Sequence, residues 1–330
     1  WKYYNEHSRG IVLFFFQTIF SQKPNQGEIA FVPFIFQLCQ KYITFDYFDR
    51  PDKSISLGEI LSQVLYLIGE YPLISDDDAK EAEIRQYFLD TAMFILNNRI
   101  VNCFCSAIKG LFDLISHSNG LILLQNDLLG LAITLLENEP ITNRLFFLIQ
   151  LLTNIYKYLP PELAETCGNI TEQNIQMFLN FVMNYDDVEI IQQALLLYQN
   201  ILPKFPMFLP ALFSPELVDN LVERCAIQGV FQLKNSICQY LAFIMINGPS
   251  EAIQLILNTS LLDDFFTIVY SDNSNEMLDQ YLEGIYASIQ KCPEGFKEYM
   301  IRTEQLDDLD NLNTESELKS KILEEFQVDE

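Results

Sequence analysis

The sequence predicts an all-α protein, a solenoid in which helical repeats stack one on the next, and three observations support this. Apolar residues recur at the spacing i, i+3, i+4, i+7, as in Ile175, Phe178, Leu179 and Val182, which places them on one face of a helix. Residues that break helices fall between these apolar segments, and strand-like alternation bounded by hairpin turns does not occur. A short helical pattern also recurs along the chain at a nearly constant spacing.

The breakers predict where individual helices begin and end. Ser214-Pro215-Glu216 predicts a helix start, with Ser as the N-cap, Pro at the first position and an acid in the first turn. Glu139-Pro140 opens another helix. Asp186-Asp187 and Ser271-Asp272-Asn273 each separate two apolar helices. Asp76-Asp77-Asp78 is interpreted as an acidic loop or helix start rather than a metal site.

The recurring pattern consists of small or apolar residues, one polar position, an apolar pair and a turn. Aligning it brings together Gln17, Tyr66, Asp113, Asn154, Asn200, Phe243 and Ala287. Neighbouring positions lie about 41 to 49 residues apart, close to the ~40–47-residue period of repeats that contain two or three helices. Such a repeat cannot bury its own apolar faces, so stacking must build a continuous core.

Four segments carry a resemblance to a known family. They are Ile68-Gly69-Glu70-Tyr71-Pro72, Asn247-Gly248-Pro249-Ser250-Glu251-Ala252-Ile253, Tyr281-Leu282-Glu283-Gly284-Ile285 and Ile322-Leu323-Glu324-Glu325-Phe326. The repeat resembles the armadillo unit, and the chain resembles a divergent importin alpha (karyopherin alpha). The resemblance implies a right-handed armadillo-repeat superhelical solenoid of about seven to eight three-helix repeats. We expect one armadillo-repeat domain over residues 1–330, with a truncated N-terminal repeat and a short acidic C-terminal tail.

Composition limits the partners. The formal net charge is −25 and the pI is about 4.3, which argues against a nucleic-acid surface or an anionic membrane surface, because both need clustered Lys and Arg. The charge favours basic partners, or it only keeps a large helical surface soluble. The seven Cys residues sit mostly in apolar helical patterns, which indicates reduced thiols and a cytoplasmic and nuclear location. No apolar run reaches the ~20 residues of a membrane span.

The resemblance also implies where a partner would bind. In importin alpha, Asn side chains on the third helices hold the backbone of an extended cargo peptide, and Trp side chains one turn away form slots for Lys and Arg stems. The Asn positions fall on Tyr66, Asp113, Asn154, Asn200 and Phe243, and the Trp positions on Ser62, Lys109, Gln150, Leu196 and Gln239. The usual Trp/Asn ladder is therefore largely lost, since the one Trp of the chain is Trp1.

These positions form the predicted peptide-binding site: Asn154, Asn200, Asp113, Tyr66, Gln150, Gln239 and Phe243. Asn154 and Asn200 either grip a peptide backbone or stabilise their own repeat turn. Asp113 either receives a Lys or Arg head or is a solvated helix acid. Tyr66, Tyr198, Phe243 and Tyr286 either contact a bound segment or belong to the core.

We therefore predict an adaptor that binds an extended segment, basic and similar to a nuclear-localisation signal, for nuclear protein import. Its partners would be cargo proteins or peptides and, through a missing N-terminal segment, importin beta. The alternative is an armadillo interaction scaffold without an import role. The sequence predicts no enzyme, cofactor, metal, nucleic-acid or membrane site, because it lacks a nucleophile–base set and a Gly-rich phosphate loop. We expect a monomer.

Overall fold

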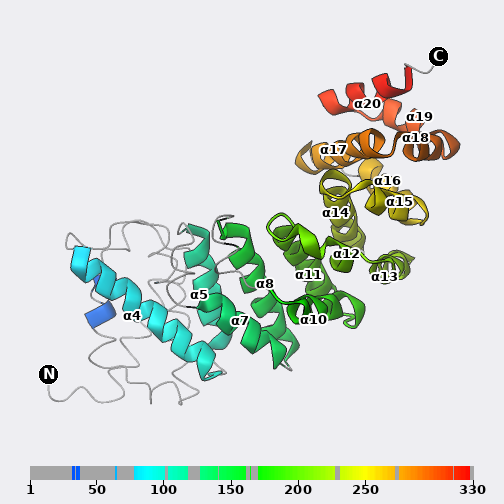
Figure 1. Ribbon diagram of the computed structural model, residues 1–330. Helices are drawn as coiled ribbons and strands as arrows, with labels where there is room; N and C mark the ends of the chain where they lie inside the picture. Colours follow the sequence, from blue (N-terminus) through cyan, green and yellow to red (C-terminus); the bar gives the residue numbers. More distant parts are fainter. Residues whose placement is uncertain are drawn as a thin grey trace, which may run out of the picture. The chain divides into compact units, whose positions relative to one another are not determined.

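A computed structural model describes residues 32–33, 35–37, 64, 78–100, 103–117, 127–139, 141–160, 164, 170–226, 231–271, 275–314 and 316–327. All regular secondary structure within these ranges is helical (Figure 1). The chain divides into two compact units, Trp1–Asn169 and Ile170–Glu330, which are taken in turn. This division does not test the prediction of one domain over residues 1–330. The predicted site residue Tyr66 lies outside the described residues.

The elements whose bounds are described in the first unit form two pairs of helices. They are α4 (Asp78–Asn97), α5 (Phe104–His117), α7 (Leu128–Glu137) and α8 (Thr142–Tyr158). Helix α4 packs against α5, α7 packs against α8, and the most extensive contact joins α5 to α8. Both helices carry fully buried aliphatic side chains, such as Leu111 on α5 and Leu148 and Leu152 on α8.

The second unit repeats one arrangement of three helices. Its elements are α10 (Glu172–Met183), α11 (Val188–Ile201), η3 (Pro206–Phe208), α12 (Leu209–Leu212), α13 (Pro215–Ala226), α14 (Phe231–Asn247), α15 (Ser250–Leu257), α16 (Leu261–Ser271), α17 (Asn275–Lys291), α18 (Pro293–Arg302), α19 (Gln305–Asn311) and α20 (Glu317–Gln327). Each short first helix, α12, α15 or α18, is followed by a second and a third helix. The third helices α11, α14, α17 and α20 pack against one another in chain order, as stacked repeats require.

The predicted helix boundaries agree with local hydrogen bonds. Helix α13 begins at Pro215, and the Ser214 hydroxyl accepts a bond from the Leu217 N–H at 3.3 Å, which confirms that start. Asp187 caps α11 by accepting from the N–H groups of Glu189 and Ile190. Helix α8 begins at Thr142, two residues after the predicted Glu139-Pro140 opening. Helix α4 begins at Asp78, while Asp76 and Asp77 lie outside the described residues.

A ladder of buried tyrosines marks the repeat on the third helices. Tyr156, Tyr198, Tyr240 and Tyr281 have no exposed surface and follow one another at intervals of 42, 42 and 41 residues. In the second unit each hydroxyl donates to a fixed acceptor: Tyr198 to the Phe178 carbonyl at 2.7 Å, Tyr240 to the Leu212 carbonyl and Tyr281 to Asn235 Oδ1 at 2.7 Å. The core of each repeat is therefore fixed by an aromatic ring and by one directional bond.

Candidate peptide-binding surface

One face of the third helices in the second unit remains partly exposed. Its members recur every three or four residues, so on each helix they form one stripe. They are Gln192, Leu196, Gln199 and Asn200 on α11; Gln232, Asn235, Ser236, Gln239, Phe243 and Asn247 on α14; and Asp279, Gln280, Glu283, Tyr286, Ala287 and Gln290 on α17. We call this set the third-helix surface. Side-chain amides dominate on α11 and α14, whereas carboxylates enter only on α17.

Hydrogen bonds join the stripes into one surface. Gln192 Nε2 on α11 donates to the Gln232 carbonyl at 2.9 Å and to Ser236 Oγ at 3.0 Å on α14. At the other end, Gln290 Nε2 on α17 donates to Glu325 Oε1 on α20 at 2.7 Å. Between them, the Tyr281 hydroxyl on α17 donates to Asn235 Oδ1 on α14, so the stripes on α11, α14 and α17 form one connected surface that adjoins α20.

Phe243 and Tyr286 lie at the same level on neighbouring helices. Helix α17 approaches α14 closely, because a Cβ atom at Gly284 would lie only 3.3 Å from the Ala242 Cα. Towards the C-terminal end, Lys291 Nζ bonds the Ile246 carbonyl at 2.5 Å. These two contacts lie on either side of Phe243 along α14 and of Tyr286 along α17, so the two residues are at a similar level of their helices. Two partly exposed rings, with the Glu283 carboxylate about one turn away, can receive the stem and the head of a Lys or Arg side chain.

Three of the predicted site residues are brought together on this surface, namely Asn200, Gln239 and Phe243. Each is partly exposed. Asn200 Nδ2 donates to the Leu196 carbonyl one turn earlier at 2.8 Å, which fixes the direction of its amide. Tyr286, an aromatic candidate, joins them, whereas Tyr198 is fully buried and belongs to the core.

The other predicted site residues lie in the first unit. Asn154 is only 4% exposed, and its Nδ2 donates to the Phe112 carbonyl on α5 at 2.9 Å. This placement favours the interpretation that Asn154 stabilises its repeat. Gln150 is partly exposed one turn earlier on α8, and Asp113 belongs to α5, but its side chain lies outside the described residues.

Burial raises the pKa values of several groups in the core of the second unit. The pKa of Tyr198 lies well above its usual value because the phenol is buried, and the neighbouring Tyr240 adds to this effect. Burial also raises the pKa of the Cys225 thiol to about 12. These groups are neutral packing elements at physiological pH rather than acids or nucleophiles.

Within the described ranges, no group of three or more His, Cys, Asp and Glu residues is placed to hold a metal ion, and Cys105, Cys225, Cys238 and Cys292 are free thiols. No single described helix is long and apolar enough to cross a membrane, although α15 and α16, bent by 91° to each other, pass that test as a pair by length and composition only.

The chain matches no protein-family model, and it has no significant match among curated proteins. Solved structures do match. An engineered protein aligns with 90% of this chain at a TM-score of 0.59 and 15% identity, and this chain spans 66% of its length. A designed armadillo-repeat protein in complex with the peptide (KR)4 aligns with 73% of this chain and 98% of its own at a TM-score of 0.56 and 17% identity. The all-α armadillo-repeat fold predicted from the sequence is thus confirmed, whereas nothing in these matches singles out importin alpha.

Proposed function

We propose that this protein is an armadillo-repeat scaffold whose third-helix surface binds an extended segment of another protein. The observation that carries the proposal is the surface in which amide side chains dominate on α11 and α14, followed by aromatic and acidic side chains on α17. A side-chain amide both donates and accepts hydrogen bonds, so it can pair with the N–H and C=O groups of an extended backbone. The designed armadillo-repeat protein with bound (KR)4 supports this use of the fold.

Charge favours a basic segment. Two cations near the surface are already engaged: Lys234 Nζ pairs with Asp264 at 3.0 Å, and Lys297 Nζ donates to the Glu325 carbonyl at 2.6 Å. Asp279 and Glu283 on α17 are exposed. An extended segment would therefore place its Lys and Arg residues over α17 and its backbone over α11 and α14.

The finer form of this proposal is an adaptor for nuclear protein import that acts without catalysis. Its cargo would carry a basic signal, it would work in cytoplasm and nucleus, and it would reach importin beta through a further segment. The second candidate is a scaffold of the same fold without an import role. The lack of Trp at Leu196 and Gln239 favours this second candidate, because the indole slots for Lys and Arg stems are missing there.

The test is fluorescence anisotropy with a labelled Lys/Arg-rich nuclear-localisation peptide and a scrambled peptide of equal charge, at low and physiological salt. We expect sequence-dependent binding that survives physiological salt, because short contacts are screened less than the overall field. Asn200→Ala and Phe243→Ala should each weaken binding by about 1–3 kcal/mol.

Asn311→Ala is the matched control. Asn311 also bonds the carbonyl one turn earlier, that of Asp307 at 2.8 Å, but it lies on α19, away from the third-helix surface. If Asn200→Ala and Phe243→Ala bind as tightly as the control while remaining folded, the third-helix surface is not the binding site. If both peptides bind equally and physiological salt abolishes the binding, the net charge of the protein is its only cause.

A further inference from the structure

The second unit carries two hollows on either side of the turn from α14 to α15. The smaller one, of about 160 Å³, we call the apolar pocket. It is lined by Leu202, Pro203, Pro206, Leu209, Phe243, Ile244, Asn247 and Gly248. Six of these eight side chains are apolar, and Met207 beside the pocket is 68% exposed. A preformed pocket of this kind gains free energy when an apolar side chain displaces its water.

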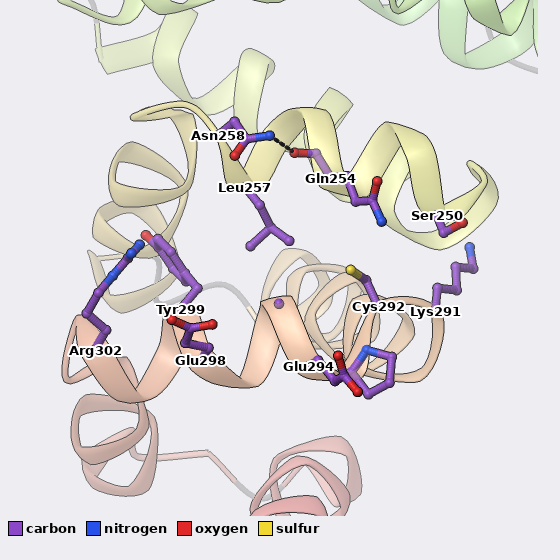
Figure 2. A pocket seen from close by; sticks show the side chains of 12 residues that line it. Ser250, Gln254, Leu257, Asn258, Lys291, Cys292, Glu294, Glu298, Tyr299 and Arg302 are labelled. Carbon is purple, nitrogen blue, oxygen red and sulfur yellow. Dashed lines mark hydrogen bonds between the residues drawn. The ribbon is translucent and has the colours of Figure 1, made fainter.

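The larger one, of about 580 Å³, lies between α15 and α18, and we call it the polar hollow. Figure 2 shows Gln254 on α15 and its C-cap residue Asn258 along one side, and Glu294 and Glu298 on α18 along the other. Its depth has a local cause: a Cβ atom at Gly295 would lie 3.2 Å from Leu257 Cδ1, so a larger residue at position 295 would fill it.

The two cations of the polar hollow, Lys291 and Arg302, differ in their contacts. Lys291 Nζ donates to the carbonyls of Met245, Ile246 and Gly248 at 3.0, 2.5 and 2.9 Å. Arg302 lies over the Tyr299 ring, with its guanidinium carbon 6.0 Å from the centroid, at the opposite end of the hollow in Figure 2. Arg302 is itself exposed, so the lining presents its guanidinium at that end together with the exposed carboxylates of Glu294 and Glu298, which lie one helical turn apart.

The two hollows share a rim. Gly248 lines the apolar pocket and Ser250 lines the polar hollow. Two residues of chain span at most about 7.6 Å between Cα atoms. A segment that crosses the turn between α14 and α15 therefore has only a short distance to span between them.

We infer that these two hollows together bind a flexible protein segment that carries an apolar side chain and, a few residues away, a lysine or arginine. The apolar side chain occupies the pocket beside Phe243, and the cation lies between the Glu294 and Glu298 carboxylates and the amides of α15. An acidic segment would meet two carboxylates of like charge, and a wholly apolar one would bury them without a partner. The apolar pocket shares Phe243 and Asn247 with the third-helix surface, whereas the polar hollow shares no residue with it.

The probe is a set of labelled Gly/Ser peptides with one Leu and one Arg, separated by about one to five residues, a range that matches the span of the rim. Matched peptides replace Leu or Arg by Ser. At the best spacing, the complete peptide should bind roughly tenfold more tightly than either matched peptide, since each side chain contributes its own burial or ion pair. Equal affinities for all three peptides at every spacing would overturn the inference.

Two variants assign the subsites. Leu209→Trp fills the apolar pocket from its partly exposed rim. The complete peptide should then bind no more tightly than the peptide without Leu, and the affinity of the peptide without Leu should not change. Glu298→Gln should abolish the affinity difference between the complete peptide and the peptide without Arg, and leave the difference due to Leu unchanged. Glu283→Gln, on the third-helix surface, should change neither of these two affinity differences. If Glu283→Gln weakens the complete peptide and Glu298→Gln does not, the peptide binds the third-helix surface, and this inference fails while the proposed function stands.

Cys292 supplies a readout that does not depend on a variant. This partly exposed thiol lines the polar hollow, and the partly exposed Cys105 lies in the first unit. Saturating complete peptide should slow alkylation of Cys292 by N-ethylmaleimide several-fold, as followed by peptide mass spectrometry, with Cys105 as the internal control. Unchanged alkylation of Cys292 at saturation would contradict binding in the hollow.

Discussion

Asn154 and Asn200 have the same side chain and the same predicted role, yet they lie in different environments. Asn154 is buried between α8 and α5 and bonds the Phe112 carbonyl. Asn200 is partly exposed and bonds its own helix at Leu196. A buried amide that joins two helices contributes to stability, because its loss removes a hydrogen bond and opens a small cavity.

We expect Asn154→Ala to lower the free energy of unfolding by about 1–3 kcal/mol. Asn200→Ala should stay within about 0.5 kcal/mol of the parent protein, as is usual for exposed positions. Urea denaturation followed by circular dichroism measures both. A fully stable Asn154→Ala protein with weakened peptide binding would instead return Asn154 to the binding site.

This pair shows the limit of sequence reasoning at a single residue. The alignment places both Asn residues at the polar position of their repeats, and the residue type is correct at both. Whether an amide is exposed depends on the carbonyl that the neighbouring repeat presents, which no spacing within the repeat encodes. The tyrosine ladder was missed for a related reason: its regular interval of 41–42 residues is visible in the sequence, but a polar hydroxyl does not mark a core position until its acceptor is known.

At the scale of the helix, the repeats hold one another by their ends. Lys291 on α17 binds three carbonyls at and just beyond the end of α14. Arg224 on α13 donates to the Met183 carbonyl at the end of α10 at 3.4 Å, and Arg99 donates to the Asn138 carbonyl just after α7 at 3.1 Å. Each cation thus meets carbonyls that lack a partner within their own helix, where the helix dipole is negative.

Lys291→Met tests this contribution. The substitution keeps the apolar stem and removes the ammonium group, so three carbonyls lose a charged donor. We expect a loss of about 1–3 kcal/mol in the free energy of unfolding and faster hydrogen exchange in the last turn of α14. Lys321→Met, at an exposed position of α20, is the control and should leave exchange in α14 unchanged. Equal protection of α14 in both variants would mean that the ammonium group is not needed there.

The helices were easier to predict than the contacts between them. Periodicity and breakers located the starts of α11 and α13, because capping by Asp187 and Ser214 is a local interaction. The end-capping cations could not be foreseen, since Lys291 reaches carbonyls 43 to 46 residues away. The fold class followed from local patterns repeated many times, whereas the candidate site depends on contacts between repeats.

At the scale of the whole molecule, positive and negative side chains have different roles. The net charge is −25 with only 20 Lys and Arg residues. Cations such as Arg224, Lys234 and Lys291 are engaged in holding repeats together. The carboxylates therefore dominate what a partner meets, which is why both proposed sites select basic segments.

The buried tyrosines and thiols also make the stability of the whole molecule depend on alkaline pH. Burial raises the pKa of Tyr198, Tyr240 and Cys238 above their usual values, and raises that of Cys225 to about 12. These groups stay protonated in the folded protein at a pH where the unfolded chain has released the proton. The unfolded state then binds fewer protons, so stability must fall as pH rises.

The loss should begin at about pH 9, where unfolded thiols titrate, and steepen above about pH 10, where unfolded tyrosines do. Each such group should contribute about 1.4 kcal/mol per pH unit while its folded form stays protonated. Urea midpoints across this range measure the slope, and Tyr198→Phe should reduce it by the share of one group. Phe178→Leu, which removes buried aromatic packing without a titrating group, should lower stability equally at every pH. A slope that Tyr198→Phe leaves unchanged would mean that the Tyr198 phenol ionises as readily in the folded protein as in the unfolded chain, which its full burial and its bond to Phe178 argue against.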